Sequence, residues 1–170
     1  EPPIPDAVGR FEIVERAPGG KGSQAAIYRA RDPESGREVA VKVLGNRFDS
    51  FASSLLSVLV GERDMEEIRR EAELLANLDH PNILSLLETG EDPVHGPYAV
   101  MEWVPGGDLK ARIEGADGGR LPLEEALGIA DDILVALEAA HGAGVIHLDI
   151  KPGNILLGGR GETKLADFGI

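Results

Sequence analysis

Three short β-prone runs stand close together in the opening part of the chain, and their spacing constrains the fold more than any other feature. They cover residues 11–14, 26–30 and 39–44 and consist mainly of Val, Ile, Ala and aromatic residues. Turns that contain Gly and Pro separate them at residues 18–23 and 32–36. Strands joined by such short turns pair in the antiparallel sense. The sequence therefore predicts a small antiparallel sheet.

Helical periodicity dominates much of the rest of the chain. Residues 64–78 and 122–141 both repeat apolar side chains at i, i+3 and i+4, as the buried face of a helix does. Pro122 suits the first turn of the second helix, and Gly142 suits its end. Strands combined with helices in this order indicate an α+β fold. The stripe of the second helix comprises Leu123, Ala126, Leu127, Ala130, Ile133, Leu134 and Leu137. Further elements are expected as strands at 83–88 and 97–103 and as a short helix at 108–113.

The composition argues against some classes of binding partner. A formal net charge of −13 argues against wrapping nucleic acid or docking on an anionic membrane, but it leaves room for a phosphate site with a few local donors. The absence of cysteine excludes disulfides and thiolate metal sites and favours a cytoplasmic location. The chain opens on Glu1-Pro2-Pro3 without an initiator Met, so we expect it to be cut from a longer protein.

Two charged side chains fall on apolar surfaces. Lys42 lies between Val41 and Val43 in the third predicted strand, where a buried ammonium needs an anion. Glu71 lies on the apolar stripe of the 64–78 helix, where a carboxylate is costly unless it is paired. Each residue by itself fits a solvated position at the margin of its element. Together they predict an ion pair that would orient the ammonium toward phosphate.

A glycine segment between the first two strands is a weaker phosphate signal. Gly20 and Gly22 would let backbone N–H groups approach a phosphate closely, although a plain hairpin turn is the simpler explanation for these two residues.

The most specific signal is a polar segment from His147 to Asn154. It contains Asp149, a lysine two residues later at Lys151, and the amide of Asn154. Such groups can position a hydroxyl, neutralise a transferring phosphoryl group and hold a metal ion. Asp167, directly before Phe168 and Gly169, adds an oxygen ligand of the kind that Mg²⁺ prefers.

Taken in order, these motifs resemble the eukaryotic-type serine/threonine protein kinases over nearly the whole chain. The resemblance implies a kinase-like α+β fold, with a small antiparallel sheet lobe, one regulatory helix and the first part of a helical lobe. It divides the chain into a lead-in at 1–9, a small lobe with its hinge at 10–104, and part of the helical lobe at 105–170. Because the chain stops after Asp-Phe-Gly, it also implies that this piece alone is incomplete for catalysis.

The resemblance assigns roles to individual residues. Asp149 would accept or orient the substrate hydroxyl, and Lys151 would stabilise the γ-phosphate. Lys42, paired with Glu71, would contact the α- and β-phosphates. The Mg²⁺ ligands would be Asn154 and Asp167. The ATP contacts would come from Gly20, Lys21, Gly22, Ser23, Ala25, Ile27, Ala40, Lys42, Met101, Glu102, Val104, Asp108 and Leu156. The implied partners are ATP and a protein with a Ser or Thr acceptor, and neither nucleic acid nor a membrane.

The sequence departs from the family pattern at several places. Leu148 replaces the Arg that usually precedes the catalytic Asp, so we expect weak gating by phosphorylation of an activation loop. Ala25 replaces a third loop glycine. The segment between Lys42 and Glu71 is longer than the pattern implies, and residues 46–60 within it show helical periodicity. We expect an additional helix there, which either packs on the sheet or offers a homodimer face.

Three other functions remain open at this stage: a pseudokinase or nucleotide-binding regulatory module, a small-molecule kinase of the aminoglycoside or choline type, and a purely structural or dimerising unit. The intact set of charged residues argues against the first. Lys151 and Asp167-Phe168-Gly169 favour protein kinases over the second. A melting curve titrated with ATP would separate the third from the rest.

Overall fold

The computed structural model describes residues 3–17, 26–43 and 78–168. The chain divides into two compact units, of which one contains residues 1–64 and 86–103 and the other residues 65–85 and 104–170. The predicted helix at 64–78, apart from Leu78, lies outside the described residues, as do the additional helix expected at 46–60 and the glycine segment. No helix in the described ranges is long and apolar enough to cross a membrane.

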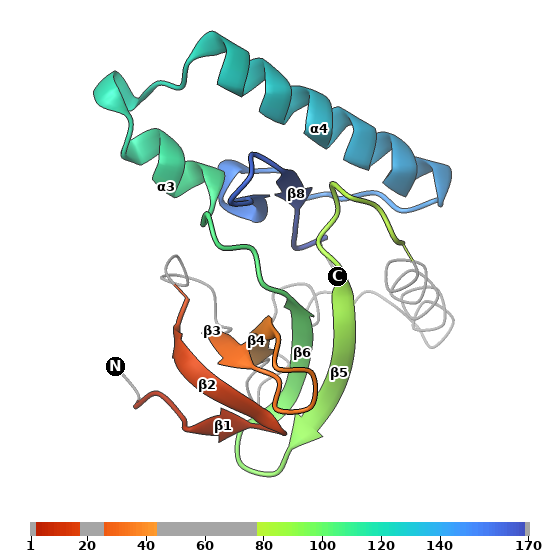
Figure 1. The fold of residues 1–170 in the computed structure, drawn as a ribbon. Coiled ribbons are helices and arrows are strands. Elements are labelled where there is room, and N and C mark those ends of the chain that lie inside the picture. Colours follow the sequence, from red (N-terminus) through yellow and green to blue (C-terminus); the bar gives the residue numbers. More distant parts are fainter. Residues whose placement is uncertain (1–2, 18–25, 44–77, 169–170) are drawn as a thin grey trace, which may run out of the picture. The chain divides into compact units, whose positions relative to one another are not determined.

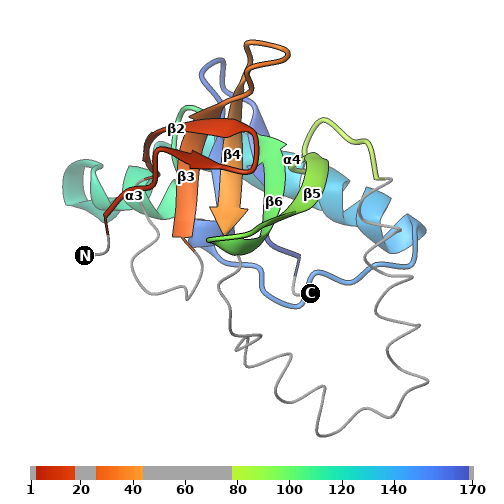
Figure 2. The same ribbon diagram turned by 90° about the horizontal axis from the view of Figure 1, so that it is seen from below.

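The first unit is built on an antiparallel sheet (Figure 1). Its strands are β1 (Ala7–Val8), β2 (Phe11–Arg16), β3 (Ala26–Arg31), β4 (Glu38–Val43), β5 (Leu86–Asp92) and β6 (Gly96–Glu102). Their order across the sheet is β1-β2-β3-β4-β6-β5, and every neighbouring pair is antiparallel. Figure 2 shows β3, β4, β6 and β5 side by side. The predicted antiparallel sheet is thus confirmed.

One face of this sheet carries the core of the first unit. The side chains of Val39 and Val41 in β4 point to it because residues two apart in a strand share a face. Phe11 and Tyr98 pack there edge to face, with ring centroids 6.2 Å apart. The buried members of the cluster are Val8, Phe11, Ala30, Val39, Val41, Tyr98 and Val100.

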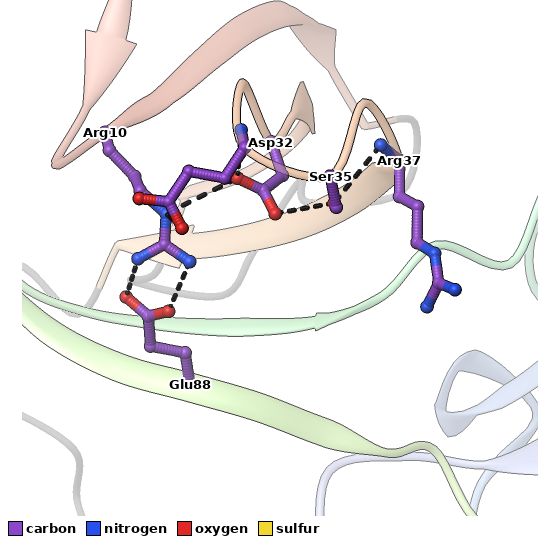
Figure 3. A network of polar contacts seen from close by, with 6 residues as sticks. Arg10, Asp32, Ser35, Arg37 and Glu88 are labelled. Atoms are coloured by element: carbon purple, nitrogen blue, oxygen red, sulfur yellow. Dashed lines mark hydrogen bonds and ion pairs between the residues drawn. The ribbon is translucent and has the colours of Figure 1, made fainter.

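The lead-in expected at residues 1–9 contributes to this sheet. β1 pairs with β2, and Val8 is completely buried in the core cluster. Arg10 then holds the beginning of β2 to distant parts of the unit, through two contacts of 2.8 and 2.7 Å with the Glu88 carboxylate and one of 3.4 Å with Asp32. Figure 3 shows this network. Because Arg10 and Glu88 are 78 positions apart in the chain, short-range patterns could not indicate it.

The second unit contains the helices. Its elements are α3 (Leu109–Glu114), a 3₁₀ turn at Asp117–Gly119, α4 (Leu123–Gly142), a second 3₁₀ turn at Pro152–Asn154, β7 (Ile155–Leu157) and β8 (Thr163–Leu165). β7 and β8 form a two-stranded antiparallel ribbon. The position expected for the strand at 83–88 is wrong, because β5 starts only at Leu86. Ile83 is instead buried in the second unit, where it forms an isolated β-bridge with Leu165.

The predicted stripe of α4 is only partly correct. Ile133 is buried, but Leu123, Leu127 and Leu134 are 73%, 60% and 64% exposed. The buried face runs instead through Ile133, Ala136 and Ala140, with Leu137 partly covered. The small alanines allow α4 to lie close to β8. The buried face of α4 is therefore the one with alanines, although the face with the leucines is more hydrophobic.

Candidate active site

The sheet places several predicted nucleotide contacts on the face opposite its core. Lys42 lies directly across from Ile27 on β3 and from Ala99 on β6. Ala40 lies across from Met101. Because opposed residues of paired strands share a face, Ile27, Ala40, Lys42 and Met101 form one continuous surface. It presents apolar side chains that suit a flat ring, with a single ammonium among them.

Other predicted contacts of the first unit are only partly described. Glu102 is the last residue of β6 and lies across from Val39. Val104, just beyond, is buried in the second unit. The remaining predicted residues Gly20, Lys21, Gly22, Ser23, Ala25 and Glu71 lie outside the described residues, so the ion pair between Lys42 and Glu71 stays a prediction.

His147 anchors the loop that follows α4. Its side chain is only 1% exposed, and the Nδ1 atom accepts a hydrogen bond from the backbone N–H of Asp149 at 3.2 Å. The ring proton must then be on Nε2, which donates to the carbonyl oxygen of Ala166 at 3.0 Å. The ring also lies against Phe168, with centroids 4.5 Å apart. One histidine therefore ties the Asp149 loop to the segment that leads into Asp167.

Two side chains of this loop converge on the carboxylate of a third. The Nζ atom of Lys151 lies 2.6 Å from Oδ2 of Asp149. The Nδ2 atom of Asn154 donates to the same Oδ2 and to the Asp149 carbonyl oxygen, both at 2.9 Å. The three predicted loop residues are thus brought together. The sequence indicated Asn154 only as a metal ligand, and its second role in holding Asp149 had no signal in the spacing.

These contacts lower the pKa of the Asp149 carboxyl group. Hydrogen bonding from Lys151 is the largest cause that holds the pKa of the Asp149 carboxyl below its ordinary value. Burial opposes this effect, and hydrogen bonding from Asn154 adds to the lowering. The carboxylate is half exposed on the loop surface. It is therefore ionised at neutral pH and can accept a hydrogen bond from an incoming hydroxyl.

The two residues with left-handed backbone angles, other than glycines, both belong to this site. Leu148 has φ 62° and Asp167 has φ 53° in the described part of the chain. Aspartate tolerates this region, whereas leucine does so at a cost. The turn at Leu148 places its side chain in solvent, 82% exposed, and turns Asp149 toward Lys151.

The donors that would hold Mg²⁺ fit that ion chemically. Both amide hydrogens of Asn154 are directed at Asp149, which leaves its oxygen as the atom for a cation. Asp167 supplies a carboxylate at the end of the segment after β8. No group of three or more acidic or histidine side chains that could hold a metal occurs among the residues described. In general, Mg²⁺ in phosphate sites is bound by one or two protein groups together with substrate phosphates.

Asp108 and Leu156 lie side by side through an isolated antiparallel bridge. Asp108 is the N-cap of α3, and its Oδ1 atom accepts the N–H of Ala111 at 2.7 Å. One carboxylate oxygen of Asp108, a predicted ATP contact, is therefore used inside the protein.

Comparison with known proteins agrees with this arrangement. The model of the protein kinase domain family matches residues 15–170. Serine/threonine-protein kinase PksC of Streptomyces coelicolor is 37% identical over 167 residues, which are 95% of this chain and 28% of that protein. Serine/threonine-protein kinase PrkC of Bacillus subtilis is 42% identical over 163 residues, again 95% of this chain but 23% of the relative. The chain thus spans about a quarter of the length of these relatives.

The fold has a solved counterpart. The crystal structure of the Mycobacterium tuberculosis PknI kinase domain superposes with a TM-score of 0.72 at 27% sequence identity, covering 96% of this chain and 61% of that one. The kinase-like α+β fold expected from the sequence is confirmed. The chain belongs to the protein kinase family.

Proposed function

We propose that this chain supplies the ATP-binding and hydroxyl-activating parts of a serine/threonine protein kinase. The observation that carries the proposal is the convergence of Lys151 and Asn154 on the Asp149 carboxylate. The names of the similar proteins support the serine/threonine class. The substrate is a protein with a Ser or Thr hydroxyl, and the nucleotide is ATP.

The chemistry follows from these positions. The substrate oxygen forms a bond to the γ-phosphorus of ATP, the bond from that phosphorus to the bridging oxygen breaks, and ADP leaves. Asp149 orients the attacking hydroxyl and is the group that receives its proton. Because its pKa is lowered, Asp149 acts mainly as an orienting acceptor and takes the proton late.

Cations surround the transferred group in this proposal. Lys151 lies close enough to Asp149 to contact both the carboxylate and a phosphoryl oxygen beside it. Lys42, on the sheet face with Ala40 and Met101, contacts the α- and β-phosphates and pairs with Glu71. Asn154 and Asp167 hold Mg²⁺, which when bound neutralises charge on the phosphates.

An ATP-titrated melting experiment with and without Mg²⁺ tests nucleotide binding in this chain. We expect ATP with Mg²⁺ to raise the melting temperature, Asp167→Ala to remove the part that depends on Mg²⁺, and Asp117→Ala, on a surface turn, to change nothing. Phosphoryl transfer is measured in the full-length protein, where Asp149→Asn should keep ATP binding but lower kcat by orders of magnitude. Near-normal kcat in that variant would refute the role of Asp149.

We also propose a location and a mode of assembly for this kinase. The kinase is placed in the cytoplasm, where ATP and Mg²⁺ are available. The 46–60 segment is a candidate homodimer face, and Phe51→Ser with Leu55→Ser distinguishes its two roles. A changed association state with unchanged stability favours the dimer, and lowered stability alone favours packing on the sheet.

A further inference from the structure

Arg29 of β3 lies on the same face of the sheet as the predicted nucleotide contacts. It follows Ile27 by two positions in β3 and lies directly across from Ala40 in β4. Residues two apart in a strand share a face, as do residues opposed across a strand pair. The Arg29 side chain therefore extends the surface that contains Ile27, Ala40, Lys42 and Met101, and the proposed function gives it no role.

A β-bulge in β2 brings a carboxylate to this arginine. Ile13 lies across from Ala30, a member of the core cluster. The register then shifts, and Glu15 lies across from Arg29 on the other face. Without the bulge, residues 13 and 15 would share a face. The Oε1 atom of Glu15 accepts a hydrogen bond from Nη1 of Arg29 at 3.0 Å, and Glu38 of β4 accepts one from Nη2.

The third partner of the guanidinium is the ring of Trp103, directly after β6. The Cζ atom of Arg29 lies 5.7 Å from the centroid of that ring, which is within the range of a cation–π contact. In the chain, Trp103 stands between Glu102 and Val104, two of the predicted ATP contacts. Arg29 thus joins β2 and β4 to the residue that follows β6.

Stability alone does not explain this arrangement. The side chains of Arg29, Glu15 and Glu38 are 31%, 53% and 40% exposed, and ion pairs of such exposure contribute little to folding. The Nε atom of Arg29 is buried and has no hydrogen-bond partner in the described part of the chain, which opposes folding. The two carboxylates instead orient the planar guanidinium, because they hold both of its ends beside the Trp103 ring.

We propose that Arg29 is a positioning residue for nucleotide binding, which fixes the Trp103 ring and thereby the backbone on both sides of it. Backbone groups that are already ordered bind a ligand more tightly, because less conformational entropy is lost on binding. Arg29 acts through Trp103 and does not contact a phosphate. This inference rests on the proposed ATP site, since it assigns the segment after β6 to the adenine.

Trp103 is the only tryptophan in the sequence, so its fluorescence reports the contact with Arg29. In Arg29→Met, we expect emission at longer wavelength and stronger quenching by acrylamide, because the ring loses the guanidinium beside it. Arg10→Met is the matched control. Arg10 also pairs with carboxylates and lies over an aromatic ring at 4.5 Å, but its partner Glu88 lies across from Val100 on the core face. This control should lower stability and leave the Trp103 emission unchanged.

Calorimetric titration of this chain with ATP and Mg²⁺ measures the effect on binding. Arg29→Met should raise the Kd for ATP about threefold to tenfold, and Trp103→Leu should raise it by a similar factor. The two changes together should raise the Kd no more than either alone, because both remove the same contact. Trp103→Phe keeps an aromatic face and should restore most of the affinity. In the full-length enzyme, the KM for ATP should rise in Arg29→Met much more than kcat falls.

Three results would each overturn the role of Arg29. They are an unchanged Trp103 emission in Arg29→Met, an unchanged Kd for ATP in that variant, and a double variant whose Kd rises by the product of the two single factors. Should Arg29→Met fail to fold, a Trp103→Leu chain that binds ATP as tightly as the wild type overturns the role equally. A wild-type chain that does not bind ATP would overturn the proposed ATP site as well, so the two failures are distinguishable.

Discussion

At the scale of single residues, Lys151 is the main cause of the lowered pKa of Asp149. The pKa of Asp149 is below its ordinary value in the folded chain, so the carboxylate stabilises the fold at pH values above its unfolded pKa, and this contribution is lost as the pH falls through the folded pKa. Lys151→Ala removes the largest cause. We expect the Asp149 pKa to rise toward that of an ordinary aspartate, near 4.

A carbon-detected NMR titration of the Asp149 carboxyl measures this change. Lys110→Ala is the matched control, because Lys110 forms its ion pair with Glu114 on α3, 3.9 Å away. In the full-length enzyme, the acidic limb of kcat/KM should move upward in the Lys151 variant by the same amount as the pKa. An unchanged titration would show that Lys151 does not control this carboxylate.

Leu148 offers a second test at this scale. An exposed leucine with φ 62° gains little from burial and carries backbone strain. Leu148→Gly should therefore raise the free energy of unfolding by up to about 1 kcal/mol, whereas Ile150→Gly, two residues away without a positive φ, should lower it. Urea unfolding of both variants gives the comparison. Equal losses in the two would mean that the left-handed turn stores no strain.

At the scale of elements, α3 depends on the Asp108 cap. The hydrogen bond from the Ala111 N–H to Oδ1 satisfies one of the free donors at the helix start. Asp108→Ala should cost about 1 kcal/mol of stability and Asp108→Asn much less, since asparagine also caps helices. Asp117→Ala, on an exposed turn without a side-chain cap, is the control. Chemical unfolding measures the stabilities of these variants. Similar losses of stability for Ala and Asn at position 108 would contradict the capping role of Asp108.

β5 and the turn before β2 both pack against the ring of Tyr98. A methyl group on Gly90 would come within 2.4 Å of the Tyr98 hydroxyl oxygen and 2.5 Å of its ring. Gly90→Ala should thus destabilise the first unit by about 1–3 kcal/mol, because a well-packed ring must move. Gly36→Ala tests backbone strain by itself, since Gly36 has a positive φ and open space around it. A milder effect at Gly90 than at Gly36 would argue against this packing.

Elements and local chemistry were predictable from the sequence to different degrees. The strands around Lys42 and the loop from His147 to Asn154 were found because their signals are short-range, namely alternation and polar spacing. The buried face of α4 was not, because the alanines at 136 and 140 pack on β8 through contacts that periodicity does not encode.

At the scale of the whole molecule, net charge and exposed apolar surface have opposite effects on the association of chains. The net charge of −13 keeps chains apart near neutral pH, and a pI near 4.7 means that this repulsion vanishes in mild acid. The face of α4 with Leu123, Leu127 and Leu134 remains exposed at every pH. Large exposed apolar patches of this kind favour association.

We therefore expect this chain to self-associate through α4, and more strongly as the pH approaches 4.7 or as salt screens the charge. Replacing Leu127 and Leu134 by Gln should shift the population toward monomer without lowering stability, because both side chains are exposed before the change. Leu87→Gln removes a leucine of similar exposure from β5 and should not alter association. Sedimentation velocity across protein concentration and pH distinguishes these cases. A monomer at high concentration near pH 5, or equal effects of the β5 and α4 variants, would show that this face does not drive association.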